Sequence, residues 1–105
     1  MSLNENTGSI ISLEVAKKLV KDFGNKFPGQ IVSSFIGSKN VHAILAQENC
    51  IGVRIYNGYD VANEKISLVL VGVDKNEQDI LESGLIYDQM LTCPPVCPVN
   101  GLLTN

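Results

Sequence analysis

The sequence has few of the residues on which common catalytic sites depend. Its 105 residues include one histidine, three cysteines and no tryptophan. A single imidazole leaves few choices for a general base. Glycine-rich phosphate loops, nucleophile elbows and helices with paired histidine ligands are also missing from the sequence. The composition therefore favours a non-enzymatic role.

A clustered surplus of positive charge is missing too. The formal net charge is −3, whereas binding to a nucleic-acid backbone needs many Lys and Arg residues on one surface. The lysines between residues 17 and 26 are typical of a solvated helix face, and Glu14 and Lys18 form a favourable i,i+4 pair. The charge pattern argues against a nucleic-acid partner.

Long hydrophobic runs are absent. The longest strongly apolar stretch, residues 66–73, is far short of the roughly 20 residues that a membrane helix needs. Residues 1–9 are polar and lack the basic start and apolar stretch of a secretory signal. We expect no membrane partner and a cytoplasmic location, with residues 1–9 a disordered or vector-derived N-terminus.

Two helices are predicted in the first half of the chain. Ser12 is a good N-cap residue, and apolar residues follow it at helical spacing from Leu13 to Phe23. Gly24 is predicted to end this helix in the left-handed conformation. A second, shorter helix is predicted to begin at Ser38 and to end near Glu48.

Strands are predicted in the second half. From Cys50 to Tyr56 apolar and other residues alternate, which is typical of a strand with one covered face. Residues 57–60 are rich in turn formers, and residues 66–73 form a strand that is apolar on both faces. Short strands are predicted around residues 80–87, and residues 30–36 fit a helix or a strand, with a preference for extended structure.

These elements predict an α+β fold in which two N-terminal helices pack on a small antiparallel sheet of three or four strands. Its 45% hydrophobic content suits one globular core, and we place the single domain at residues 10–92. Residues 93–105 begin with three prolines and two cysteines within six positions. Because proline lacks a backbone donor, we expect an extended or turn-rich C-terminal tail.

Four segments carry a resemblance to a known group of proteins. They read GVRIY from Gly52, LVLVGVD from Leu68, LIYD from Leu85 and CPPVCP from Cys93. In this succession the chain resembles a family of short bacterial proteins to which no activity is assigned. The resemblance covers roughly the last half of the chain, and it implies a bacterial, cytoplasmic origin and a shared fold.

The thiols and the imidazole suggest one candidate metal site. Cys93, Cys97, Cys50 and His42 together make a possible Cys3His zinc set. The three-residue spacer with two prolines does not match a zinc knuckle, so the alternatives are a Cys93–Cys97 disulfide or redox pair and a Cys50 that is a small core residue. We expect no cofactor, and zinc is the one alternative that these residues leave open.

The two-faced strand suggests an interface. If the helices cover one face of the sheet, Val69, Val71 and Val73 are exposed on the other, and a homodimer would cover them. The alternative is that the chain covers this face itself. A small-molecule pocket between helix and sheet that uses Arg54 and Tyr56 is a further possibility.

Two functional hypotheses follow. The leading one is a non-enzymatic binding or interaction module that self-associates through its sheet. The alternative is a thiol or zinc-binding protein that uses the three cysteines and the histidine.

Overall fold

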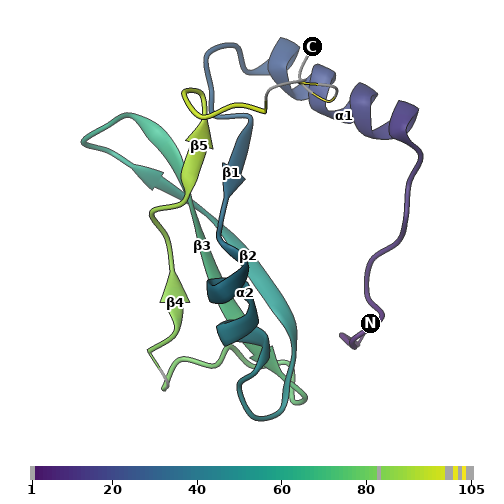
Figure 1. The fold of residues 1–105 in the computed structure, drawn as a ribbon, viewed down its shortest axis with the longest axis vertical. Helices are drawn as coiled ribbons and strands as arrows, with labels where there is room; N and C mark the ends of the chain where they lie inside the picture. Colours follow the sequence, from purple (N-terminus) through teal and green to yellow (C-terminus); the bar gives the residue numbers. More distant parts are fainter. Residues whose placement is uncertain (1, 83, 99–100, 102, 104–105) are drawn as a thin grey trace. The chain divides into compact units, whose positions relative to one another are not determined.

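The computed structural model describes residues 2–82, 84–98, 101 and 103, which form an α+β fold (Figure 1). The strands pair antiparallel, in one sheet of two strands and one of three. The described elements, in chain order, are α1 (Leu13–Lys26), β1 (Ser33–Phe35), α2 (Ser38–Leu45), β2 (Cys50–Asp60), β3 (Lys65–Asp74), β4 (Ile86–Tyr87) and β5 (Leu91–Cys93).

The chain divides into two compact units. The first contains Met1–Thr7 and Ile36–Met90, and the second contains Gly8–Phe35 and Leu91–Asn105. The three-stranded sheet and α2 belong to the first unit, whereas α1, β1 and β5 belong to the second. The expected boundaries of a single domain and a tail stay a prediction.

In the first unit the strand order is β2-β3-β4. The β2–β3 pairing runs from Asp60 opposite Lys65 to Cys50 opposite Asp74, with one register shift near Gly52. β4 pairs with only two residues of β3. Since β2 is the first strand in this order, it is a long edge strand. The paired side chains of β2 and β3 lie alternately on the two faces of the sheet.

Helix α2 covers one of these faces (Figure 1). A Cβ atom on Gly72 of β3 would lie 3.3 Å from the Ile44 side chain and 3.1 Å from the Cys50 sulfur. Only glycine therefore allows the helix and the following loop to approach β3 this closely. Ile44 is completely buried here. The second predicted helix and its start at Ser38 are confirmed, but it ends at Leu45 and not near Glu48.

The predicted turn at residues 57–60 is wrong, because β2 continues to Asp60. Gly58 lies so close to β3 that an added Cβ would be 2.5 Å from the Ser67 carbonyl oxygen. The turn lies after the strand, where the Asp60 carboxylate accepts hydrogen bonds from the backbone and side chain of Asn63. The turn-forming residue types at 57–60 are therefore part of the long β2–β3 hairpin, and they do not end β2.

In the second unit, the predicted N-cap of α1 is confirmed, since the Ser12 hydroxyl accepts a hydrogen bond from the Val15 amide. The helix does not stop at Gly24 but runs to Lys26. The Phe27 amide still donates to the Phe23 carbonyl, and the two rings lie 5.2 Å apart. This i,i+4 aromatic contact supports the extra turn.

The extended structure preferred for residues 30–36 is confirmed in part, because β1 pairs with β5 and the Val32 amide donates to the Cys93 carbonyl. Thr92 and Cys93 are buried at this pairing. After Cys93 the described tail turns, and the Val96 amide donates to the Thr92 carbonyl. That α1 packs on the larger sheet, and that the whole tail is extended, are not confirmed.

Candidate functional site

A polar bridge joins β2 to the segment after β3. The Asp79 carboxylate accepts a hydrogen bond from the Tyr56 hydroxyl through one oxygen and forms an ion pair with the Arg54 guanidinium, 2.5 Å away, through the other. The Asp79 side chain is 18% exposed and that of Arg54 is 34% exposed. Both carboxylate oxygens of Asp79 therefore have partners.

The bridge passes over β3. Arg54 is paired with Val71 across the β2–β3 boundary, whereas Asp79 forms a bridge with Val73 from the other side of β3. The Arg54–Asp79 contact must therefore cross the surface of β3 that Val71 and Val73 occupy. These two valines are only 2% and 3% exposed.

This burial corrects the expected interface. Val71 and Val73 were predicted to be exposed for a partner, but side chains of the same unit cover them, and Val69 is half-buried. Val71 and Val73 are thus core residues of the chain itself. The alternative that the chain covers this face itself is confirmed at Val71 and Val73.

The proposed pocket between helix and sheet is also corrected. Gly72 faces α2, and Arg54 and Tyr56 lie on the opposite face because their partners are Val71 and Val69. Hydrogen bonding with Tyr56, followed by the contact with Asp79, raises the pKa of Arg54 above its ordinary value. The guanidinium stays charged and serves as a structural donor.

The outer edge of β2 is an open edge of this sheet. No strand of the described residues pairs with it. Its second half carries exposed side chains, with Ile55 58%, Tyr56 46% and Tyr59 56% exposed. Unpaired backbone groups beside exposed apolar and aromatic side chains are the features to which another strand can add.

A hollow of about 400 Å³ flanks the first half of β2. The N-terminal segment closes it on one side, where the Leu3 amide donates to the Glu77 carboxylate at 3.2 Å. The lining residues are Leu3, Asn4, Glu5, Thr7, Ile51, Gly52, Val53, Arg54, Ile55 and Val73. Because the hollow reaches no further than Ile55, residues 56–60 are the more accessible part of the edge.

A second hollow, of about 470 Å³, lies beside the turn after β3. Its lining includes the carboxylates of Glu48, Asp74, Asp79 and Glu82. Asp79 is used by the bridge, and Asp74 accepts hydrogen bonds from backbone amides of its own turn. Within the described part of the chain, no group of three or more His, Cys, Asp or Glu residues is placed to hold a metal ion.

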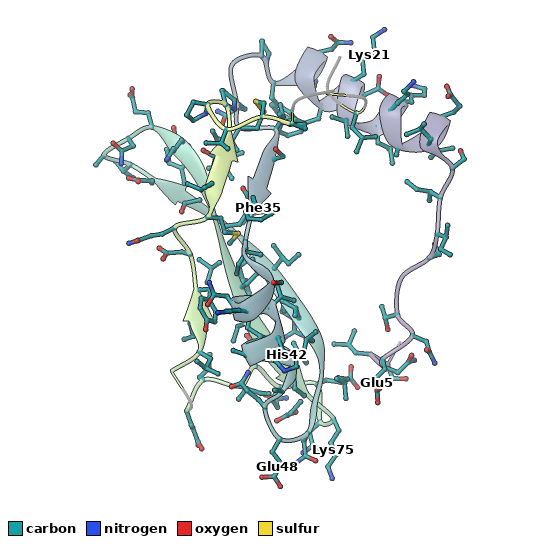
Figure 2. The ribbon with its side chains drawn as sticks, in the orientation of Figure 1. Glu5, Lys21, Phe35, His42, Glu48 and Lys75 are labelled. Carbon is teal, nitrogen blue, oxygen red and sulfur yellow. A yellow bond between two sulfur atoms is a disulfide. The ribbon has the colours of Figure 1, made fainter. Side chains whose placement is uncertain are left out.

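The four predicted metal ligands are found in different settings. Cys93 and Cys97 form a disulfide. Cys50 is a half-buried free thiol whose sulfur donates to the Gly52 carbonyl at 3.3 Å. His42 is exposed on α2 (Figure 2). A sulfur in a disulfide is not a thiolate ligand, so the zinc set stays a prediction for the reduced protein alone.

Comparisons with known proteins give no relatives. No protein-family model matches the sequence, and no curated protein and no solved structure matches it significantly. Over the residues that the structure describes, no helix combines the length and apolarity needed to cross a bilayer.

Asp79 is the site residue that the sequence did not indicate. Arg54 and Tyr56 drew attention as a polar pair on a strand, but Asp79 lies 23 residues beyond Tyr56 in a segment without a distinctive pattern. One signal was present. An arginine and a tyrosine two positions apart project from one face of a strand, so a single polar partner on that face can bind both.

Proposed function

We propose that this chain is a non-enzymatic interaction module that forms a homodimer through the edge of its larger sheet. The observation that carries the proposal is the outer edge of β2, an 11-residue strand that pairs with β3 on one side and with no strand of the described residues on the other. Exposed Ile55, Tyr56 and Tyr59 line its second half.

Edge strands that stay monomeric usually carry protection. Prolines, repeated lysines, bulges or a covering loop keep such an edge from pairing with a second chain. β2 contains no proline and no lysine, and its register shift lies at the far end near Gly52. The accessible half of the strand is left without these devices, which supports a role in pairing.

Other aspects of the proposal come from the whole chain. The net charge of −3 supports a partner other than a nucleic acid, and we place the protein in the cytoplasm. The polar groups of the Arg54–Asp79 bridge are satisfied by one another, which supports a structural role for them and a non-enzymatic function.

Sedimentation velocity tests the proposal. At tens of micromolar the protein should sediment as a dimer, and Ile55→Lys should shift it to monomer because it puts a charge into the pairing edge. Leu81→Lys is the matched control, since Leu81 is equally exposed at 58% and lies outside the strand. A wild-type monomer at these concentrations would refute self-association.

A thiol function is the second candidate, and the Cys93–Cys97 disulfide favours it. Cys97 is exposed whereas Cys93 is buried, so an incoming thiolate has access to the Cys97 sulfur. Attack there releases Cys93 as a thiolate, which takes up a proton; a second thiol of the same reductant then frees Cys97 and leaves the reductant as a disulfide.

The cytoplasm keeps most thiols reduced, so a cytoplasmic protein would hold this pair open for much of the time. Free-thiol titration before and after a dithiol reductant should count one and then three thiols. Elemental analysis of the reduced protein would then show whether the three thiols bind zinc. Three thiols without zinc, and no exchange with glutathione buffers, would refute the second candidate.

A further inference from the structure

Helix α1 has an apolar face that the described part of the chain leaves open. None of its 14 residues is buried. Leu13 is 50% exposed, Leu19 is 59% exposed and the C-cap residue Phe27 is 49% exposed. Val20 and Phe23 belong to the same face by helical spacing, and they are half-buried. Because an amphipathic helix normally buries such a face, its exposure indicates a docking surface.

The segment before α1 adds to this apolar surface. Ile10 is fully exposed and Ile11 is 50% exposed, and both precede the N-cap residue Ser12. Two adjacent isoleucines without cover gain from transfer out of water. The N-terminal end of the helix thus carries apolar side chains that a partner surface can bury.

The charges nearest to the apolar face are positive. At 100° per residue, Lys17 and Lys26 lie roughly 90° from the centre of the face, one on each side. The carboxylates of Glu14 and Asp22 lie roughly 125–155° from it, on the polar side. There Asp22 forms an ion pair with Lys18 at 2.7 Å. Lysines at the border of an apolar face place their stems along it and their ammonium groups in a polar layer.

The net charge of α1 is opposite to that of the rest of the chain. Four lysines against two acidic residues give the helix a net charge of +2. Since the whole chain carries −3, the rest carries −5. An anionic surface therefore attracts α1 and repels the remainder. A second copy of α1 would present the same positive charge, so the charges favour an anionic partner over a helix dimer.

We infer that α1 binds the surface of anionic lipid bilayers, with its apolar face at the boundary of headgroups and acyl chains and Lys17 and Lys26 among the headgroups. The expectation of no membrane partner was drawn from the lack of a spanning stretch, and a helix that lies in the interface needs none. The inference goes beyond the proposed self-association and concerns the other unit of the chain.

Vesicle flotation with the full chain tests the inference. Vesicles of about 70% phosphatidylcholine and 30% phosphatidylserine should carry the protein, whereas pure phosphatidylcholine vesicles should carry far less. Since each lysine near an anionic surface contributes roughly five-fold in affinity, the double variant Lys17→Gln and Lys26→Gln should bind about 25-fold more weakly. High salt should weaken binding of the wild type as well, because it screens these charges.

Two pairs of variants test the orientation of the helix. Leu19→Glu should abolish flotation, and Leu81→Glu is its matched control because the two leucines are 59% and 58% exposed; circular dichroism checks that both variants fold. The chain has no tryptophan, so Leu19→Trp reports on the apolar face and Asn25→Trp on the opposite one. Vesicles should shift the emission of Leu19→Trp to the blue and leave that of Asn25→Trp unchanged.

The outcomes separate this inference from the proposed self-association. No flotation with phosphatidylserine, equal flotation with both kinds of vesicle, or a blue shift of Asn25→Trp alone would overturn the inference. So would a dimer that Leu19→Glu, but not Ile55→Lys, converts to monomer, because it would assign the face to a second copy. A monomer that floats refutes only the dimer through β2, and a dimer that does not float refutes only the membrane surface.

Discussion

Gly58 gives the sharpest test of how β2 is held against β3. Its Cβ position lies 2.5 Å from the Ser67 carbonyl oxygen, whereas ordinary contacts begin at 3.4 Å. A Gly58→Ala variant must therefore move the two strands apart by roughly 0.9 Å at this point. A backbone hydrogen bond of about 2.9 Å would be stretched beyond useful length by that movement.

The expected cost follows from these distances. Overpacking of this kind costs about 1–3 kcal/mol, and the smaller backbone entropy of alanine in the unfolded chain offsets about 0.4–1 kcal/mol of it. We expect a net loss of about 1–2 kcal/mol, which corresponds to a fall of about 4–16 °C in Tm for a domain of this size.

Thermal unfolding followed by circular dichroism measures the effect. Gly52→Ala is the matched control, because it lies on the same strand and its added Cβ has no atom within 4 Å. That variant should keep or slightly raise Tm. If Gly58→Ala unfolds at the same temperature as Gly52→Ala, the close approach of β2 to Ser67 is refuted.

Three further predictions concern single residues. Gly24→Ala should stabilise α1 by about 1 kcal/mol, measured by urea unfolding, because Gly24 lies inside the helix with open space around it; an unchanged or lower midpoint would contradict a helical Gly24. Asp79→Asn should lower the urea midpoint more than Asp22→Asn does, because Asp79 is 18% exposed and Asp22, paired with Lys18, is 57% exposed; equal effects would contradict the bridge. The pKa of Asp60 is lower in the folded protein than in the unfolded chain. Its ionised carboxylate therefore stabilises the fold above the unfolded pKa of about 3.9, and this effect is lost as the pH falls through the folded pKa. Asp60→Asn should lose less stability than wild type between pH 5 and pH 2 when Tm is measured against pH.

Local patterns predicted the elements better than their limits. The Ser12 cap and the alternation from Cys50 identified α1 and β2 correctly. Gly24 and residues 57–60 were misjudged because their conformations are decided by contacts with Phe27 and β3, which propensity does not contain. The strand at residues 66–73 was correctly predicted to be apolar on both faces. Helix α2 lies on one face of β3, and the Arg54–Asp79 salt bridge lies on the other.

The candidate site was less predictable. Exposure of Val71 and Val73 was one of two alternatives that the apolar pattern left open, and the structure buries both valines on the face that the Arg54–Asp79 salt bridge crosses. Such a bridge depends on a partner 25 residues from Arg54, and strand periodicity cannot identify it. The edge of β2 was likewise hidden, since its residues 57–60 were read as a turn.

Hydrogen exchange at two protein concentrations tests the central claim most directly. Between about 1 and 100 µM, amides within residues 54–60 that point away from β3 should become protected as the second copy pairs with them, whereas the free-edge amides between residues 65 and 69 should not change. Equal exchange of residues 54–60 at both concentrations, or new protection confined to residues 65–69, would contradict a dimer built on the edge of β2.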